Sequence, residues 1–297
     1  MKKRFLIIAN PISGGGKGRE SAARLCEAIR ELHCDAECFI TQSSGDARSR
    51  AADAAAEATD GIVVVGGDGT VNEVLNGMRD MTVPLTTLAM GTANVLAREL
   101  GLPRQPSALA RIVADGRTLP AAVGRANGRK FLLFTSCGLD AAIVRRLEEV
   151  RRGRLGMIRW IPSILHIIRR WPVRRLSFTT ADGLTHEDLS TVLVTRVRTY
   201  GGILRLPGQI RLDDGRLHVL GFRQRSRLQY LRAVIRSLCG RLRENVDVVC
   251  TTTTALQIRG EDAPWQVDGD LGGTGSVDVS LDESQVRLFI PESAASA

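Results

Sequence analysis

The sequence predicts a doubly wound α/β domain at the N-terminus, followed by a β-rich, antiparallel, sandwich-like domain. Over about the first 100 residues, four short apolar runs alternate with helical patterns, an order typical of a mostly parallel sheet covered by helices. After about residue 120, short β-rich runs dominate, separated by Asn-Gly and Asp-Gly turns. Such turns are typical of antiparallel hairpins.

Residues 61–77, GIVVVGGDGTVNEVLNG, form the clearest α/β unit of the chain. Ile62–Val65 is an unbroken β-branched run, which is typical of a strand buried on both faces of a parallel sheet. A glycine turn follows at once, and Val71, Val74 and Leu75 then recur at helical spacing. A strand, a glycine turn and a helix start place backbone N–H groups where they can hold phosphate.

Asp68 is the unexpected residue of this turn, because a carboxylate repels bound phosphates. We therefore expect it to face a metal ion or a donor hydroxyl. Thr70 and Asn72 follow it in an order that strengthens the interpretation as a nucleotide site.

Phe5–Ala9 predicts the first buried strand, and the loop that leaves it is NPISGGGKG. The loop differs from a P-loop, because Pro11 stands where the first glycine belongs and Lys17 is followed by Gly18. It remains a glycine-rich anion nest ahead of a helix. The residues expected on the core face of that helix are Ala22, Leu25, Cys26, Ile29 and Leu32.

The rest of this domain is expected to be a strand, a helix, a second strand and a short helix, at Ala36–Thr41, Ala47–Thr59, Leu85–Ala89 and Val95–Leu100. In the turn before the last helix, Thr92 and Asn94 could bond a ribose or a phosphate, or could cap the helix. Capping is favoured for either residue taken alone. The ligand should lie at the carboxyl ends of the strands, where all three glycine loops emerge.

The second domain is expected to contain eight strands, at Ala121–Arg125, Lys130–Ser136, Arg174–Thr180, Thr191–Val197, Arg216–Phe222, Val246–Thr252, Ala255–Arg259 and Gln266–Asp268. Two acidic loops stand out here. The loop RLDDGR, residues 211–216, is either a β-turn or a Mg²⁺ site made of a carboxylate and backbone carbonyls. The loop VDGD places Asp268 and Asp270 two residues apart, hence on one face if the strand continues. Such a pair could tune a general base, although a solvated turn explains the spacing equally well.

The formal charge of +9 and the pI near 9.8 favour an anionic partner. With 4% aromatic residues there are few stacking platforms, so we expect no nucleic acid. Six cysteines without a CxxC pair, and an N-terminal apolar run too short for a signal peptide, predict a cytoplasmic protein.

The segment 145–175 is rich in arginine and apolar residues, with Trp160 and Trp171 at the two ends of its apolar stretch. This composition suits a helix lying in the interface of an anionic membrane, on the inner face of the cell membrane. A partly buried helix with solvated arginines is the alternative. Residues 223–243 repeat the composition more weakly.

Taken together, the motifs resemble the diacylglycerol kinase catalytic-domain family over nearly the whole chain. They are NPISGGGKG, GGDGTVNEVLNG, MGTANVLA, SCGLDAAIV, TYGGILRLPGQIRLDDGRLHV and VDGDLGG. GGDGT is shared with NAD kinases, whereas the last two motifs are more specific to lipid kinases. The resemblance implies a nucleotide-binding domain, residues 1–122, to which 285–297 return as a strand near Val286–Ile290. A lipid-substrate domain would span residues 123–284.

The resemblance also implies the site residues. ATP would be held by Asn10, Pro11, Ser13, Gly14, Thr41, Gly66, Gly67, Asp68, Gly69, Thr70, Val71, Asn72, Thr92 and Asn94. Mg²⁺ would be held by Asp214 and the carbonyls of Arg211 and Arg216. Asp270 would accept the substrate proton, with Asp68 and Asp268 as further catalytic candidates.

Two positions depart from the family pattern. Val95 stands where an aspartate usually follows the asparagine of the MGTAN turn, and Asp270 stands where the proton acceptor is usually glutamate. The predicted function is an ATP- and Mg²⁺-dependent lipid kinase that phosphorylates the hydroxyl of a diacylglycerol-like lipid. An NAD kinase-like enzyme and a non-catalytic nucleotide- or lipid-sensing module are the alternatives. The sequence leaves the identity of the lipid, and the formation of a homodimer, open.

Overall fold

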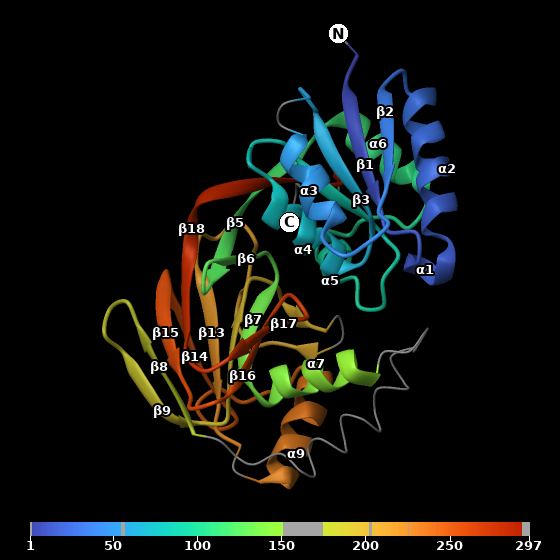
Figure 1. Ribbon diagram of the computed structural model, residues 1–297. Coiled ribbons are helices and arrows are strands. Elements are labelled where there is room, and N and C mark those ends of the chain that lie inside the picture. Colours follow the sequence, from blue (N-terminus) through green and yellow to red (C-terminus); the bar gives the residue numbers. More distant parts are fainter. Residues whose placement is uncertain (1, 55–56, 151–174, 202–203, 225, 293–297) are drawn as a thin grey trace. The chain divides into compact units, whose positions relative to one another are not determined.

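The computed structural model describes residues 2–54, 57–150, 175–201, 204–224 and 226–292. The chain divides into two compact units (Figure 1). Unit 1 comprises Met1–Ala121 and Glu283–Ala297, and unit 2 comprises Ala122–Asp282.

Unit 1 is built on a parallel sheet with the strand order β2-β1-β3-β4, and the end of β18 lies beside β4. The strands are β1 (Arg4–Ala9), β2 (Asp35–Ile40), β3 (Gly61–Gly66), β4 (Leu85–Ala89) and β18 (Val277–Phe289). Every residue of β3 is buried, as its β-branched sequence predicts.

The helices of unit 1 are α1 (Ser13–Gly16), α2 (Gly18–Glu31), α3 (Asp46–Asp53), α4 (Asp68–Gly77), α5 (Val95–Glu99) and α6 (Pro106–Asp115). Helix α2 packs against α6, and α3 packs against α4. The chain runs from β1 to β2 in one direction and then crosses back to β3 and β4 in the other. The predicted doubly wound α/β domain is thus confirmed, with its topological switch point between β1 and β3.

Three details of unit 1 differ from the expectation. Leu32 follows the last residue of α2 and is 38% exposed, so it is not part of the core face. Helix α3 ends at Asp53, earlier than predicted. Helix α6 was not predicted, although Pro106 at its start and Gly116 in the left-handed conformation at its end are the usual helix boundaries.

The described residues of unit 2 form two larger antiparallel sheets and a short two-stranded one. Its strands are β5 (Thr118–Ala126), β6 (Arg129–Phe131), β7 (Phe134–Gly138), β8 (Leu176–Thr180), β9 (Thr185–Leu189), β10 (Thr191–Thr195), β11 (Thr199–Tyr200), β12 (Leu204–Arg205), β13 (Leu217–Phe222), β14 (Val248–Thr253), β15 (Ala255–Arg259), β16 (Pro264–Val267) and β17 (Asp270–Thr274). One sheet has the order β14-β13-β10-β7-β16-β17, and the other contains β18-β15-β8-β9.

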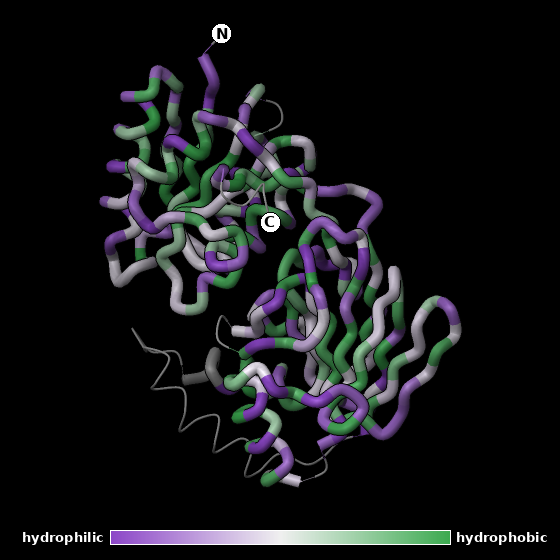
Figure 2. The backbone as a smooth tube through the Cα atoms, turned by 180° about the vertical axis from the view of Figure 1, so that it is seen from behind, coloured by the Kyte–Doolittle hydropathy of each residue, from purple (hydrophilic) through white to green (hydrophobic). Residues whose placement is uncertain are grey.

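The core of unit 2 combines inward-facing residues of both sheets, among them Phe178 from β8, Val192 from β10 and Val267 from β16. This confirms the predicted sandwich-like domain. Hydrophobic residues follow the strands in the middle of each unit, whereas hydrophilic residues gather in loops and on the outer turns of helices (Figure 2).

Several strands of unit 2 differ from the prediction. The run expected as one strand at 130–136 is divided into β6 and β7, which pair with different partners. Strands β9 and β17 were not predicted. Strand β18 is 13 residues long and begins well before the expected Val286, because its first half pairs with β15 in unit 2.

The described residues of unit 2 include the helices α7 (Leu139–Val150) and α9 (Arg227–Leu238). Helix α9 begins with a capping box between Ser226 and Gln229. The predicted interfacial helix around Trp160 and Trp171 lies outside the described residues. Within the part of the chain that the structure describes, no helix is long and apolar enough to cross a membrane.

Candidate active site

Three glycine-rich loops meet at the carboxyl edge of the unit 1 sheet, next to its switch point. Their main chains are hydrogen-bonded to one another and to the neighbouring strand. The N–H of Asn10 donates to the carbonyl of Val65 at 3.0 Å, and the N–H of Met90 donates to Gly66 at 2.8 Å. The N–H of Gly14 donates in turn to the carbonyl of Met90 at 2.8 Å. The loops after β1, β3 and β4 therefore form one assembly, as the parallel topology predicts.

Glycine is needed in this assembly because the loops touch backbone to backbone. A Cβ on Gly91 would lie 2.7 Å from the Cα of Gly67, and a Cβ on Gly18 would lie 2.0 Å from the carbonyl oxygen of Asn10. No side chain fits at such distances. These glycines thus serve first to pack the loops together, whereas the sequence interpretation assigned the glycines of this site to the approach of an anion.

Asp68 connects the second and third loops. Its carboxylate oxygens accept hydrogen bonds from the N–H groups of Val95 at 3.0 Å and Leu96 at 3.3 Å, at the start of α5. Burial raises the pKa of Asp68, and these backbone donors oppose that rise. The expectation that Asp68 faces a metal ion or a hydroxyl stays a prediction, because the structure shows its contacts with the protein alone. Its partners are main-chain donors, and it satisfies the N-terminus of a helix.

Asn94 differs from the expectation in a related way. It was expected to cap α5, but its side chain bonds the N–H and the carbonyl of Gly91, at 2.8 and 2.7 Å, and so closes the turn. The capping role falls to Asp68 instead. Val95, which replaces the family's aspartate, is 1% exposed, so a carboxylate at this position would be buried beside Asp68.

The residues predicted to hold ATP fall into two groups. Those accessible at the loop surface, in part or fully, are Asn10, Pro11, Ser13, Gly14, Gly67, Asp68, Gly69 and Thr92. Those buried are Thr41, Gly66, Thr70, Val71, Asn72 and Asn94.

Besides Asn94, two of the buried residues, Thr41 and Asn72, have side-chain partners within the protein. The hydroxyl of Thr41 donates to the carbonyl of Ala9 at 3.3 Å, and the carboxamide oxygen of Asn72 accepts from Asn76 at 3.1 Å. Side-chain contact of Thr41, Val71 and Asn72 with a nucleotide stays a prediction, and all three side chains are buried in the described structure.

A buried guanidinium lies against the predicted magnesium loop of unit 2. The side chain of Arg196, directly after β10, is 0% exposed and donates to Asp214 Oδ1 at 3.1 Å. It also donates to the carbonyls of Arg216 and Leu212. Burial lowers the pKa of Arg196, and the neighbouring Asp214 carboxylate opposes that fall.

The Asp214 carboxylate has two further partners. Its Oδ1 accepts from the N–H of Arg216 at 3.0 Å, and its Oδ2 contacts Nε2 of His218. Arg211 pairs its own side chain with Asp213, at 2.9 and 3.0 Å. The predicted Mg²⁺ ligands do not fit a cation here, because donors already point at the Asp214 carboxylate and the Arg216 carbonyl. Among the described residues, no group of three or more His, Cys, Asp or Glu side chains could hold a metal ion.

The VDGD loop places its two carboxylates in different surroundings. The strand does not continue through it, because Asp268 and Gly269 both adopt positive φ and form the turn between β16 and β17. Asp268 is buried and accepts from the N–H groups of residues 132, 133 and 134, at 2.9–3.0 Å. Asp270 is about 40% exposed and pairs with Arg129 at 2.7 Å. Because the strand does not continue, the condition for both carboxylates to share one face is not met, and Asp268 is a structural anchor for this turn.

A polar network beside this turn was missed in the sequence. Asp140, in the first turn of α7, accepts hydrogen bonds from Ser136, from Tyr200 and from Gln266. Gln266 also accepts from the N–H of Gly269 at 2.8 Å. Asp140 is thereby linked to the turn that carries Asp270. The available signal was the motif SCGLDAAIV, which contains both Ser136 and Asp140, and the motif beginning TYGG, which contains Tyr200.

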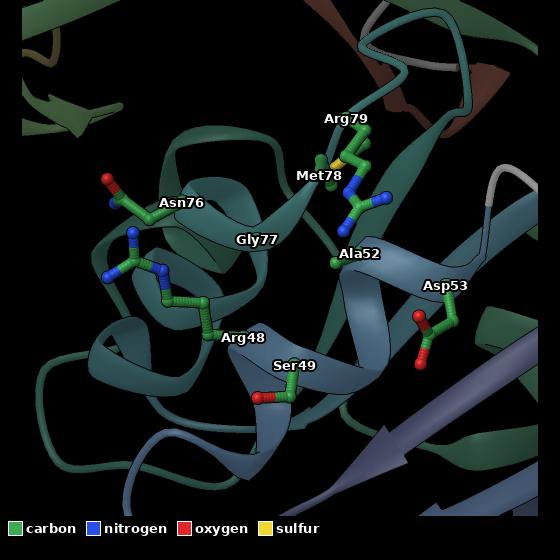
Figure 3. A pocket seen from close by; sticks show the side chains of 8 residues that line it. All are labelled: Arg48, Ser49, Ala52, Asp53, Asn76, Gly77, Met78 and Arg79. Atoms are coloured by element: carbon green, nitrogen blue, oxygen red, sulfur yellow. The ribbon is translucent and has the colours of Figure 1, made fainter.

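A shallow pocket lies where α3 meets the C-terminal end of α4 (Figure 3). It is lined by Arg48, Ser49, Ala52, Asp53, Asn76, Gly77, Met78 and Arg79. The two helices touch here, since a Cβ on Gly77 would lie 2.0 Å from the carbonyl oxygen of Arg48. The pocket is at the opposite end of α4 from the glycine turn, and none of the predicted site residues lines it. We therefore assign it no part in the chemistry.

A doubly wound domain with three joined glycine loops, combined with an antiparallel sandwich, defines a class of two-domain nucleotide-dependent kinase folds. Residues 4–126 match the model of the diacylglycerol kinase catalytic domain. Residues 134–290 match the model of the YegS C-terminal NAD kinase beta sandwich-like domain. The chain belongs to the diacylglycerol kinase catalytic-domain family.

Relatives and solved structures agree with this membership. The chain is 25% identical to a diacylglycerol kinase of Bacillus subtilis over 91% of each chain. It is 28% identical to a diacylglycerol kinase of Mycobacterium tuberculosis, over 97% of this chain and 95% of the relative.

A crystal structure of a diacylglycerol kinase from Bacillus anthracis has a TM-score of 0.75 at 22% identity, covering 99% of this chain and 98% of that one. The structure of an NAD kinase from Archaeoglobus fulgidus in complex with ATP has a TM-score of 0.57 at 14% identity. It covers 98% of this chain and 95% of the other. At these identities the two structures establish the shared fold.

Proposed function

We propose that this kinase-family protein transfers the γ-phosphate of ATP to the hydroxyl of a diacylglycerol-like lipid. The observation that carries the proposal is the joined assembly of glycine loops at the switch point of unit 1, in a chain of the diacylglycerol kinase catalytic-domain family. The relatives named diacylglycerol kinase support the lipid as substrate.

The glycine loops support ATP as the phosphate donor. The first N–H groups of α4 have no partner within the helix, and in the described structure no side chain caps that end. Its dipole and its exposed amides favour a phosphate at Gly67–Gly69. The ATP bound in the NAD kinase of the same fold is in keeping with this assignment.

Mg²⁺ would enter with the nucleotide, where it neutralises charge on the phosphates. The residues of this chain that would face that complex are the accessible polar groups of the loops, among them Ser13 and Thr92. The Asp214 loop is not assigned to it.

We assign proton removal to Asp270. In the reaction the lipid hydroxyl oxygen bonds to the γ-phosphorus, the bond from that phosphorus to the β-phosphate oxygen breaks, and the hydroxyl proton passes to the carboxylate. Asp270 is partly exposed, so a substrate can reach it, whereas the buried Asp268 already accepts three N–H groups. Arg129 and the network of Asp140 and Gln266 position the turn.

The proposal is tested with labelled ATP and a panel of lipid alcohols in mixed micelles. We expect transfer to a diacylglycerol-like lipid, and a rate lower by about 10²–10⁴-fold in Asp270→Asn, the range for a lost general base. Asp270→Glu should retain far more activity. Phosphorylation of NAD and of no lipid would make the NAD kinase alternative correct, and absence of all turnover would favour the sensing module.

The exposed face of α9 supports docking on an anionic membrane, from the inner side of the cell membrane. Four apolar residues at helical spacing, Leu228, Leu231, Ile235 and Leu238, are each 43–56% exposed. Arg232 and Arg241 are exposed beside them. An apolar stripe with neighbouring cations suits the interface of an anionic bilayer, where the lipid substrate resides.

We expect Leu231→Glu with Ile235→Glu to weaken binding to anionic vesicles by at least about tenfold, because two charges replace inserted apolar side chains. Leu184→Glu is the matched control, since Leu184 is 43% exposed on the β8–β9 hairpin. Binding by the parent should weaken with salt. Equal binding by the double variant and the control would contradict the assignment of α9.

A further inference from the structure

Arg196 is fully buried, and the two terminal nitrogens of its guanidinium donate to oxygens of a single loop. Nη1 donates to Asp214 Oδ1 and to the carbonyl of Arg216, and Nη2 donates to the carbonyl of Leu212. The carbonyl of Leu212 also accepts from the N–H of Ala122 at 3.2 Å. The guanidinium thus fastens the 212–216 loop to the end of β10.

These oxygens include two of the three groups implied as Mg²⁺ ligands, namely the Asp214 carboxylate and the Arg216 carbonyl. Mg²⁺ requires several oxygens at about 2.0–2.1 Å in octahedral geometry. Donor N–H groups that point at the same oxygens exclude that arrangement. A divalent ion here would also face the positive charge of Arg196.

We propose that Arg196 is a built-in cation of the 212–216 loop, and that Asp214 consequently binds no divalent ion in this protein. The guanidinium supplies the positive charge and the directional contacts that a metal would supply. The order of the loop then does not depend on divalent ions. This inference goes beyond the proposed function, since it holds whichever alcohol is phosphorylated, and it leaves Mg²⁺ carried by the nucleotide unaffected.

The test measures thermal unfolding of the full chain without nucleotide, in EDTA and across a titration of MgCl₂. The variants are Arg196→Met, Asp214→Asn and the double variant. Arg198→Met is the matched control, because Arg198 lies two residues away and is exposed. Binding of MnCl₂, followed by its electron paramagnetic resonance signal, gives a second readout.

We expect the parent protein to melt at the same temperature in EDTA and in MgCl₂, apart from a general salt response that Asp214→Asn shares. Arg196→Met should lose at least about 5 °C in EDTA, because it removes a fully buried guanidinium and leaves the partly buried Asp214 carboxylate without that partner. MgCl₂ should restore part of that loss saturably, and the double variant should show no such recovery.

Two outcomes would overturn the proposal. One is a parent protein that is stabilised by Mg²⁺, or binds Mn²⁺, more than Asp214→Asn does. The other is an Arg196→Met variant that is as stable as Arg198→Met in EDTA. If Arg196→Met fails to fold, the comparison of the parent with Asp214→Asn still decides whether Asp214 holds a divalent ion.

Discussion

Asp68 of unit 1 and Asp268 of unit 2 both follow a strand and both accept main-chain N–H groups, yet they act on different kinds of structure. Asp68 takes its donors from a neighbouring glycine loop and so completes an assembly whose working parts are main-chain groups. Asp268 takes its donors from the β6–β7 connection and fixes a turn whose working part is a side chain, Asp270.

This difference shows that the candidate site of unit 1 is built from main-chain groups, whereas that of unit 2 is built from positioned side chains. Unit 1 places glycines where side chains would obstruct the loops. Unit 2 surrounds its buried or partly buried carboxylates with internal donors. These are main-chain N–H groups at Asp268, hydroxyl and amide side chains at Asp140, and the guanidinium of Arg196 at Asp214. A buried acid of unit 2 should therefore matter for stability, and an acid of unit 1 for both stability and nucleotide binding.

The largest effect is expected for Asp268→Ala, which leaves three buried N–H groups without an acceptor. We expect the free energy of unfolding to fall by about 3–5 kcal/mol. Urea unfolding measures this. Asp270→Ala is the matched control, because it removes one partly exposed ion pair and should cost at most about 1 kcal/mol. Equal losses of unfolding free energy in Asp268→Ala and Asp270→Ala would contradict the assignment of Asp268 as the structural residue of this turn and Asp270 as the base.

Asp68→Asn should have an intermediate effect on stability. An amide offers one acceptor oxygen, so the two N–H groups of α5 lose part of their cap, at about 1–2 kcal/mol. ATP affinity should fall as well, because the second and third loops separate. Thr92→Ala, in the exposed part of the third loop, serves as the control and should unfold within about 0.5 kcal/mol of the parent. An Asp68→Asn protein with unchanged stability and ATP affinity would contradict the joined assembly.

A further difference between the two units concerns the pH dependence of stability. Burial raises the pKa of Asp140, although bonds from Ser136, Tyr200 and Gln266 oppose the rise. A raised folded-state pKa makes the protein lose stability as pH increases from about 4, by at most about 1.4 kcal/mol per pH unit. Asp140→Asn should lack this slope in unfolding curves measured between pH 4 and pH 7.

For Glu37 of unit 1, the change of stability with pH has the opposite sign. Its pKa is lowered by Arg50 and then by Arg4, so its contribution is present above about pH 4.3 and is lost as pH falls through the folded-state value. Glu37→Gln should therefore have a lower free energy of unfolding than the parent protein at neutral pH, and the two values should become equal in acid. If Asp140→Asn and Glu37→Gln changed the pH dependence of the free energy of unfolding in the same direction, the opposite pKa shifts of Asp140 and Glu37 would be contradicted.

The glycine loops could be predicted from sequence because their signal is local. A buried strand, a glycine turn and a helix follow one another within 61–77, and parallel topology then brings the loops together. The roles of the carboxylates could not be predicted in this way. The donors to Asp268 lie 134 to 136 residues earlier in the chain, and Arg196 lies 18 residues before Asp214. Only folding reveals that these groups meet.

Strand β18 has a consequence for how the chain is made. Its first half pairs with β15, and Leu288 near its end pairs with Leu85 of β4, about 200 residues earlier. At synthesis rates of about 5–20 residues per second, the edge of β4 waits about 10–40 s for this partner. An exposed strand edge can pair with another chain during that interval. The N-terminal sheet is thus completed late, and its unpaired edge is the point at which a ribosome-bound chain is most prone to aggregate.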